Sequence, residues 1–286
     1  MSRIAYVNGQ YVRHSNAAVH IEDRGYQFAD GVYEVCEILA GHLVDETRHM
    51  DRLERSLREL SIDIPMDRKP MGVILREVVS RNRVTNGLVY IQVTRGVAPR
   101  NHFFPTSDTA PAIVVTARSS STAKSAALAE KGVGVISVPD NRWDRVDIKS
   151  VSLLPNVLAK QAAKEQGSYE AWFVDENGFV TEGSSTNAWI VTKDGVIVTR
   201  SADSGILRGI TRMAVLELAE RENIRIEERA FTIEEAQQAK EAFITAATTV
   251  VMPVVNIDGA AIGNAAPGSV ATNLRKLFHT QVEIAH

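Results

Sequence analysis

The sequence predicts a two-domain protein of the α+β or α/β class. Segments with strand periodicity and segments with helical periodicity occur in both halves of the chain, and a short polar stretch separates the halves. A chain of 286 residues is long enough for two medium-sized domains, each with its own core. Its 44% of hydrophobic and 23% of charged residues are typical of a globular protein, so we expect folding without cross-links.

The first half combines several strands with one helix. The segment IAYVNGQYV (4–12) alternates around an Asn-Gly pair, which predicts a hairpin because both turn positions accept positive φ. HMDRLERSLREL (49–60) carries apolar residues at helical spacing, so we expect an amphipathic helix with Arg52 on its polar face. Three further strands are predicted at 32–39, 88–95 and 111–117.

A polar segment divides the chain. Residues 118–126, RSSSTAKSA, are small and polar and show no periodicity, which is typical of a linker. We therefore expect an N-terminal domain at 1–118, a linker at 119–125 and a C-terminal domain at 126–286.

The second half again mixes strands and helices. A helix is expected at about 153–166, where Gly167 stops it. Hairpins are expected at 169–183 and 188–199, the second of them around an Asp-Gly turn. The remaining predicted elements are strands at 132–138, 241–246 and 250–258, and helices at 210–222, 234–239 and 270–285.

Charge and cysteine content narrow the class of partner and compartment. The formal net charge of -3 offers no electrostatic reason for a nucleic acid or an anionic membrane as partner. Cys36 is the single cysteine, so no internal disulfide can form. The first residues, MSRIAYVNGQ, lack a basic segment followed by an apolar one, and no stretch has the apolar length that spans a bilayer. We expect a cytoplasmic protein.

The segment DIKSVSLLPN (147–156) places Lys149 between an isoleucine and a run of small and apolar residues. A lysine in such a setting usually ends a strand, with its stem packed and its ammonium in water. Alternatively, burial favours the neutral amine, which can form a Schiff base with an aldehyde. Pyridoxal phosphate is the obvious such aldehyde. It also requires an anion site, a group opposite its ring nitrogen and an opening for the substrate.

Residues 205–211, GILRGIT, are a candidate anion site, because a glycine-bearing loop there enters a predicted helix. Exposed N–H groups and the helix dipole favour an anion, and Thr211 adds a hydroxyl, although such a pattern is more often an N-cap alone. Arg52 and the pair Thr248-Thr249 are further candidates, each otherwise an ordinary surface or turn residue.

Two other segments meet the remaining requirements. Glu182, in TEGSSTN (181–187), stands at a strand end, where a carboxylate can keep a pyridine nitrogen protonated; the alternative is a solvated turn carboxylate. VTRGVAPRNHFF (93–104) carries Arg100 and His102. The planar donors of arginine suit a carboxylate, and the alternative is a basic loop in water.

Eight segments in order resemble the class IV pyridoxal-phosphate aminotransferases, and among them most of all the D-amino-acid aminotransferases. The similarity runs almost from end to end of the chain. The segments are EDRGYQFADGVYEV (22–35), HMDRL (49–53), VTRGVAPRNH (93–102), RWDRVDIKSVSLL (142–154), LAKQ (158–161), YEAWFVDENGFVTEGSSTN (169–187), ILRGITR (206–212) and TAATTVVMPV (245–254). The resemblance implies a homodimer of fold type IV. Each chain would have a small N-terminal α/β domain, a larger C-terminal domain with a mixed, barrel-like sheet, and the cofactor in the cleft between the domains.

The resemblance also implies roles for the matching residues. Lys149 would carry pyridoxal phosphate and later move the proton, and Glu182 would face the pyridinium nitrogen. The phosphate would be held by Arg52, the N–H of Ile210, Thr211, and Thr249 or Thr248. Residues that would pack on the ring, support the site or lie near the ring hydroxyl are Leu207, Ser184, Ser185 and Arg142. No metal ligand is implied.

Tyr33, Arg100 and His102 resemble the trap for the substrate α-carboxylate in D-amino-acid aminotransferases, where the loop reaches the partner subunit's site. Reversing the position of the carboxylate exchanges the substituents around the α-carbon, so the same lysine would process the opposite enantiomer. The implied reaction is ping-pong transamination between a D-amino acid, such as D-alanine or D-glutamate, and 2-oxoglutarate or pyruvate. The alternatives are a branched-chain L-amino-acid aminotransferase, a 4-amino-4-deoxychorismate lyase and a dimeric binding protein without enzymatic activity.

Overall fold

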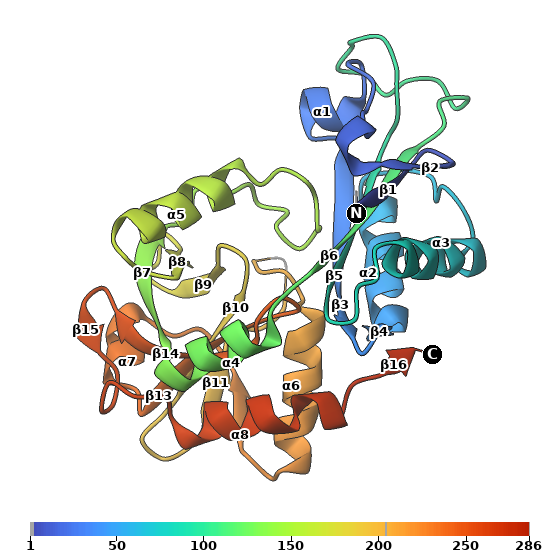
Figure 1. The fold of residues 1–286 in the computed structure, drawn as a ribbon. Coiled ribbons are helices and arrows are strands. Elements are labelled where there is room, and N and C mark those ends of the chain that lie inside the picture. The colour runs from blue at the N-terminus through green and yellow to red at the C-terminus, as the bar shows by residue number, and fades with distance from the viewer. Residues whose placement is uncertain (1–2, 204, 286) are drawn as a thin grey trace. The chain divides into compact units, whose positions relative to one another are not determined.

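The computed structural model describes residues 3–203 and 205–285. The chain forms two compact units, and both mix helices and strands, in agreement with the predicted class (Figure 1). The first unit contains the chain up to Ser121, residues 148–152 and the segment that starts at Glu283; the second contains residues 122–147 and 153–282. The segment around Lys149 thus groups with the first unit, whereas the predicted boundaries include it in a domain at 126–286.

The first unit is built on a seven-stranded sheet with the order β16-β4-β3-β5-β6-β1-β2. Every neighbouring pair is antiparallel. The strands are β1 (Ile4–Val7), β2 (Gln10–Arg13), β3 (Gly31–Leu39), β4 (His42–Val44), β5 (Gly87–Thr94), β6 (Ala112–Ser119) and β16 (Ile284–Ala285). The hairpin predicted at the N-terminus is confirmed, with positive φ at both Asn8 (44°) and Gly9 (92°).

Two helices, α2 (Glu46–Glu59) and α3 (Arg68–Arg81), pack against one face of this sheet (Figure 1). Because side chains alternate along a strand, Cys36 of β3 and Ile91 of β5 point to the helices and share a core with Leu57 of α2. Tyr33 and Gln92 are opposite each other in the strand register and occupy the alternate positions, so they lie on the other face of the sheet.

Residues 148–152 lie along an open edge of β3. The N–H of Tyr33 donates to the carbonyl of Lys149 at 3.0 Å, and the N–H of Val151 donates to the carbonyl of Gly31 at 3.0 Å. This edge is available because β4 pairs only with the far end of β3. The pairing fixes the backbone on both sides of Lys149.

The second unit is built on a nine-stranded mixed sheet with the order β12-β11-β10-β13-β14-β7-β8-β9, and β15 pairs with β14. The strands are β7 (Val133–Pro139), β8 (Glu170–Val174), β9 (Val180–Gly183), β10 (Asn187–Val191), β11 (Ile197–Thr199), β12 (Ile226–Glu228), β13 (Glu241–Ala246), β14 (Val250–Ile257) and β15 (Ala260–Ala261). The tight turn 184–186 joins β9, at one end of the order, to β10 in its interior. The sheet therefore curls, as the resemblance implies.

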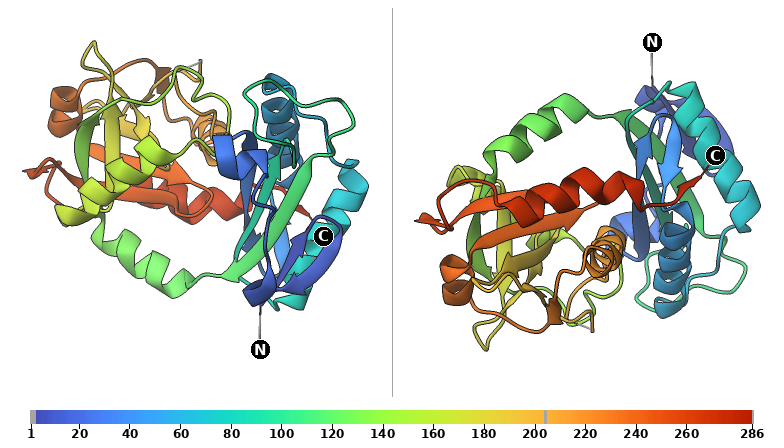
Figure 2. Two further views of the ribbon diagram at one scale, coloured as in Figure 1. Left: turned by 90° about the horizontal axis from the view of Figure 1, so that it is seen from above. Right: turned by 90° about the horizontal axis from the view of Figure 1, so that it is seen from below.

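Helices cover both faces of this second sheet. On one face, α6 (Ile210–Arg221) and α8 (Ser269–Leu277) share a core with Trp189 and Phe243, whose rings stack 5.3 Å apart. Figure 2 shows α8, in red, along strands β13 and β14. On the other face, α4 (Thr122–Lys131) and α7 (Ile233–Gln238) contribute to a core around Ile190 and Ile244. The helix α5 (Leu154–Glu165) packs on β7 and β8.

Several helices differ from the sequence predictions, and α1 (Arg24–Phe28) was not expected at all. The helix α3 was not predicted, and α4 begins at Thr122, inside the expected linker at 119–125. Alanine is the best helix former, and TAKSAALAEK contains four alanines, of which Ala129 is buried; this outweighs the missing periodicity. No helix among the described residues combines the length and the apolar character that crossing a membrane requires.

The predicted helix at 270–285 is too long. The helix α8 ends at Leu277, and residues 284–285 form strand β16, which pairs with β4. The N–H of Asp45 donates to the carbonyl of Glu283 at 2.8 Å, and the side chain of Asp45 accepts the N–H of Glu283 at 3.2 Å. Tertiary pairing of this segment therefore overrides its apparent helical pattern.

Candidate active site

Lys149 is held by the backbone pairing with β3, and its N–H also donates to Ser56 Oγ at 3.3 Å. The side chain is half-buried, and Nζ lies 4.3 Å from the centroid of the Tyr33 ring. Among the residues that the structure describes, Nζ makes no hydrogen bond and no ion pair. No carboxylate therefore competes for this amine within the described chain, as a nucleophilic lysine requires.

Tyr33 belongs to an aromatic and amide cluster on the same face of the first sheet. Its ring stacks on Tyr90 with a centroid distance of 5.7 Å, and the Tyr90 hydroxyl donates to Gln92 Oε1 at 2.7 Å. Burial, together with the neighbouring Tyr33, raises the pKa of Tyr90 to about 12, so Tyr90 stays a neutral donor. Neither Tyr90 nor Gln92 was predicted from the sequence.

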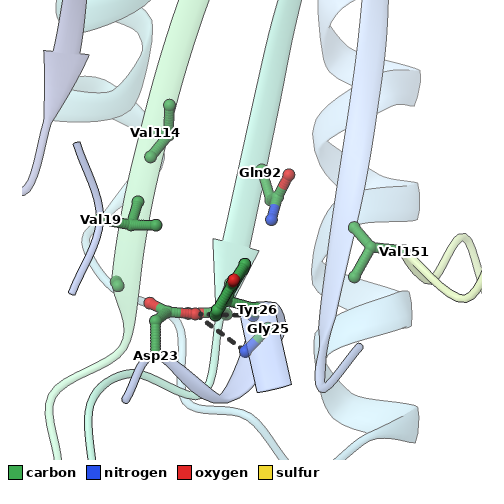
Figure 3. A pocket seen from close by; sticks show the side chains of 9 residues that line it. Val19, Asp23, Gly25, Tyr26, Gln92, Val114 and Val151 are labelled. Carbon is green, nitrogen blue, oxygen red and sulfur yellow. Dashed lines mark hydrogen bonds between the residues drawn. The ribbon is translucent and has the colours of Figure 1, made fainter. Parts of the chain in front are cut away.

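A pocket opens beside this cluster, with Gln92 in its wall (Figure 3). Val151, two residues after Lys149, also lines it. Asp23 also lines it and accepts the N–H groups of Gly25 at 2.8 Å and Tyr26 at 3.4 Å (Figure 3). The lining residues are Val19, Asp23, Gly25, Tyr26, Gln92, Thr94, Ala112, Val114 and Val151.

Arg52 lies on α2, and its guanidinium is paired with a buried carboxylate. Nε and NH2 of Arg52 donate to the two oxygens of Glu34 at 2.7 and 2.9 Å, and His49 Nδ1 lies 2.7 Å from Glu34 Oε2. Burial alone would raise the pKa of Glu34, but the Arg52 charge and the hydrogen bonds from Arg52 and His49 hold that pKa well below its usual range. Glu34 and His49 were not predicted from the sequence as neighbours of Arg52. The pattern that could have indicated them is a glutamate at a position of β3 that faces the apolar core.

Arg100 and His102 lie exposed on the connection between β5 and β6. The Arg100 guanidinium lies 4.6 Å from the centroid of the Phe28 ring, and the His102 ring lies 5.5 Å from it. Within the described part of this chain, neither side chain makes a hydrogen bond or ring contact with Tyr33. The trap expected from these three residues, with the loop at the partner subunit's site, stays a prediction.

Glu182, at the end of β9 in the second unit, is buried and held by several donors. Arg142 NH1 donates to its Oε1 at 2.6 Å, Asn187 Nδ2 to its Oε2 at 3.2 Å, and the N–H of Leu207 to both oxygens at 3.1 and 3.2 Å. Burial would lower the pKa of Arg142, but hydrogen bonds and charge from Asp140 and Glu182 raise it instead. The solvated-turn alternative is therefore wrong for Glu182, since only 5% of this residue is exposed.

Leu207 and Arg142, two predicted ring neighbours, therefore meet at Glu182 through hydrogen bonds. Asn187, which sequence reasoning missed, connects them further, because its Nδ2 also donates to the Leu207 carbonyl at 3.0 Å. Asp140, equally missed, accepts from Arg142 Nε at 2.9 Å and from NH2 at 2.7 Å. These contacts fix the orientation of the Glu182 carboxylate.

The N-terminus of α6 presents Ile210 and Thr211, both buried. The N-cap residue of this helix is Gly209, which has no side chain that could cap it. In the turn between β13 and β14, Thr249 Oγ1 is buried without any hydrogen-bond partner among the described residues, and Thr248 is exposed. A buried donor without a partner and an uncapped helix N-terminus are features that fit a bound phosphate.

The backbone after Thr249 is strained. Val250 has φ of 57°, in the left-handed region that β-branched residues rarely adopt. Such a conformation costs on the order of 1–3 kcal/mol and is concentrated at functional sites. The strain therefore supports a binding role for the turn at 247–249.

Ser184 and Ser185 contact a buried carboxylate, Glu170, that was not predicted from the sequence. Both hydroxyls donate to Glu170, that of Ser185 at 2.8 Å, and Lys160 Nζ lies 3.2 Å from the same carboxylate. Asn156 Nδ2 donates to the carbonyl of Ser184 at 2.9 Å. The two serines therefore shape the turn after Glu182.

The residue types fit pyridoxal phosphate. Within the described chain, an amine without a polar partner suits its aldehyde, and an oriented buried carboxylate suits its ring nitrogen. A helix N-terminus with glycine as its N-cap residue and a buried threonine hydroxyl without a partner among those residues suit its phosphate. The model of one family, amino-transferase class IV, matches residues 31–257. The chain belongs to the class IV aminotransferases.

This class IV aminotransferase has relatives that match it over nearly their full length. It is 42% identical over 275 residues to the D-alanine aminotransferase of Bacillus licheniformis, which covers 96% of this chain and 95% of the relative. It is 39% identical over 279 residues to the D-alanine aminotransferase of Staphylococcus aureus (strain MSSA476), with 97% of each chain covered.

Solved structures of other aminotransferases share the fold. The branched-chain amino acid aminotransferase of Escherichia coli has a TM-score of 0.89 and 22% identity, covering 98% of this chain and 94% of that one. A hypothetical aminotransferase from Mycobacterium tuberculosis, in its PLP-bound form, has a TM-score of 0.83 and 20% identity, with 97% and 98% covered. The expected fold type is therefore confirmed.

Proposed function

We propose that this class IV aminotransferase uses pyridoxal 5'-phosphate to exchange the amino group of D-amino acids, D-alanine foremost, with 2-oxoglutarate or pyruvate. The observation that carries the proposal is Lys149 Nζ, 4.3 Å from the Tyr33 ring centroid and without a polar partner among the described residues. The D-alanine aminotransferases at 39–42% identity support the choice of substrate.

When bound, pyridoxal phosphate supplies a conjugated ring that accepts the electrons of the bond broken at the substrate α-carbon. Lys149 Nζ would hold the cofactor covalently between turnovers, and once displaced it would take the proton from the α-carbon. Glu182 would keep the proton on the ring nitrogen, because Arg142 and Asn187 orient its carboxylate. Leu207 would pack against the ring, and Ser184 and Ser185 would support the turn.

The phosphate would be bound by the start of α6, through the N–H of Ile210 and the hydroxyl of Thr211. Thr249 Oγ1 would find its partner there, and Thr248 would be a further donor. Arg52 would add positive charge, although Nε and NH2 are already engaged with Glu34.

The substrate carboxylate would be bound by Tyr33 together with Arg100 and His102 of a second copy. A homodimer is part of the proposal, because several large apolar side chains are exposed in the first unit. They lie on segments 19–26 and 97–104, with 76% of Ile21 and 81% of Phe103 exposed. A cytoplasmic location is also part of the proposal.

Light scattering tests the dimer. The expected mass is twice the 31.3 kDa of one chain. Replacing Phe103 by aspartate should weaken the association, because it places charge on an exposed apolar surface. A monomer at micromolar concentration would remove the second copy from the proposed carboxylate site.

A matched panel of D- and L-amino acids with 2-oxoglutarate tests the reaction. We expect turnover with D-alanine and none with L-leucine, which would instead indicate the branched-chain activity. Lys149→Ala should abolish turnover and the covalent adduct that borohydride traps, whereas Lys193→Ala, at an exposed turn, should change neither. An adduct that survives in the Lys149 variant would refute the proposed role of this lysine.

A further inference from the structure

The connection that carries Arg100 and His102, residues 95–111, has no helix or strand of its own. Connections longer than roughly 15 residues in a compact domain are usually functional or disordered. The contacts that hold residues 95–111 in place therefore determine where Arg100 and His102 lie. Contacts from α1 (Arg24–Phe28) and the residues after it supply the answer.

A nearly buried ionic cluster anchors both the start and the middle of the connection. Asp30 accepts from Arg24 Nε at 2.8 Å and from Arg95 Nε at 2.8 Å and NH2 at 3.0 Å. The exposed fractions of these side chains are 5% for Arg24, 9% for Arg95 and 12% for Asp30. Because pairing inside a protein is weakly screened by solvent, the carboxylate locks the two guanidinium groups in place.

The remaining donors of Arg24 fix the backbone around His102. NH1 donates to the carbonyl of Asn101 at 2.6 Å and approaches that of Phe103 at 3.4 Å. These carbonyls stand on either side of His102 in the chain. A planar guanidinium that bonds flanking carbonyls sets the direction of the residue between them.

Phe28, the last residue of α1, contacts both functional side chains. Its ring centroid lies 4.6 Å from the guanidinium carbon of Arg100 and 5.5 Å from the His102 ring centroid. The guanidinium of Arg24 lies 4.9 Å from the same centroid. A cation is attracted to an aromatic ring at such distances, so one half-buried ring sets the positions of Arg100 and His102 together.

We infer that Phe28 and Arg24 are positioning residues for substrate carboxylate recognition. Phe28 holds the side chains of Arg100 and His102 at a common ring, and Arg24 holds the backbone that carries them. The inference rests on the proposed function, since Arg100 and His102 are themselves proposed ligands of the carboxylate. Neither positioning residue touches the substrate in this scheme.

Phe28→Leu tests the ring in the holoenzyme, because leucine keeps apolar bulk and removes the aromatic face. We expect KM for D-alanine to rise roughly two- to five-fold, the effect of one partly exposed cation–π contact, with kcat and the cofactor spectrum unchanged. Phe28→Tyr should restore KM. Tyr11→Leu is the matched control, since the Arg81 guanidinium lies 4.1 Å from the Tyr11 ring, and it should leave KM unchanged.

A double-mutant cycle separates positioning from general packing. In an Arg100→Ala/His102→Ala background, Phe28→Leu should have no further effect on KM. An equal rise of KM in that background would overturn the inference, as would an unchanged KM for Phe28→Leu when Arg100→Ala raises KM. An unchanged KM for Arg100→Ala itself would instead refute the proposed carboxylate site.

Amide hydrogen exchange of the holoenzyme tests Arg24 without reference to activity. Arg24→Lys keeps the charge but cannot bond Asp30 and the two carbonyls at once, so exchange across 99–104 should accelerate and KM should rise. Arg68→Lys, at an exposed pair with Glu54 and Asp51, is the control and should change neither. Unaltered exchange at 99–104 in the Arg24 variant would contradict its positioning role.

Discussion

At the scale of single residues, the surroundings of the Thr249 hydroxyl differ from those of the buried Thr199 hydroxyl. Thr199 Oγ1 donates to the carbonyl of Ala188 at 2.9 Å, as buried hydroxyls normally do. Thr249 Oγ1 is equally buried and has no such partner among the described residues. A buried hydroxyl without a partner destabilises the protein unless a ligand supplies the partner. The structure thus favours a ligand at Thr249.

Thr249→Val should therefore have opposite effects on stability and on binding. Without cofactor, the free energy of unfolding should stay equal or rise by about 1 kcal/mol, because an unsatisfied hydroxyl is replaced by a methyl group. The affinity for pyridoxal phosphate should fall, because one phosphate donor is lost. Urea unfolding and a cofactor titration measure the two quantities.

Thr199→Val provides the comparison for this change. It removes a hydroxyl that is bonded to a backbone carbonyl, so it should lower the free energy of unfolding by roughly 1–3 kcal/mol and leave cofactor affinity alone. If both valine variants destabilise the apo protein equally, Thr249 Oγ1 has a partner in solution and does not depend on a ligand for one.

At the scale of elements, the start of α6 is shaped by one close approach. A Cβ at Gly209 would lie 2.1 Å from Asn187 Oδ1, so only glycine lets Asn187 reach both Glu182 and the Leu207 carbonyl. The φ of Gly209 is −63°, which any residue adopts, so the constraint is contact and not backbone conformation. One position thereby couples the helix N-terminus to the carboxylate.

Gly209→Ala should force Asn187 away from Glu182. We expect the free energy of unfolding to drop by roughly 1–3 kcal/mol, the usual cost of overpacking, and the cofactor affinity to fall. Adding Asn187→Ser should recover part of the loss in stability, because the clash is removed. Gly134→Ala is the matched control, since its Cβ would meet nothing closer than 3.4 Å. Equal effects of the two alanine variants would contradict this account.

At the scale of the whole molecule, the chain passes between its two units more than once, whereas the sequence predicts a single boundary at 119–125. Residues 148–152 interrupt the second unit in sequence, and the segment from Glu283 follows it, yet both group with the first unit. The first unit therefore depends on strand pairing from three parts of the chain. Its interior also contains the buried pair of Glu34 and Arg52, which makes its stability depend on pH.

Glu34→Gln should reveal that dependence. The folded-state pKa of Glu34 lies below its ordinary value of 4.5, so the charged carboxylate stabilises the fold above about pH 4.5, and this contribution is lost as the pH falls further. At pH 7 the variant should lose roughly 3–5 kcal/mol, because a buried charge remains without its partner. The gap to the wild type should narrow on acidification, as followed by urea unfolding from pH 7 to pH 3.

Glu54→Gln serves as the control for Glu34. Its partner Arg68 is 45% exposed, so the variant should lose at most about 1 kcal/mol at pH 7. A wild-type advantage over Glu34→Gln that stays constant down to pH 3 would show that folding does not lower the pKa of Glu34.

The two-unit mixed class, most helices and hairpins, the family, and the residues proposed for chemistry could all be predicted from the sequence. These features depend on local periodicity, on turn residues such as Asn8-Gly9, and on contiguous motifs. Three pairings became visible in the folded chain alone: Glu34 pairs with Arg52, Glu170 binds Ser184 and Ser185, and Asn187 links Glu182 to Leu207. In each pairing, the residues meet because of how the strands pair and how the chain turns back on itself. The spacing of residues along the sequence does not specify which positions of two strands lie opposite each other.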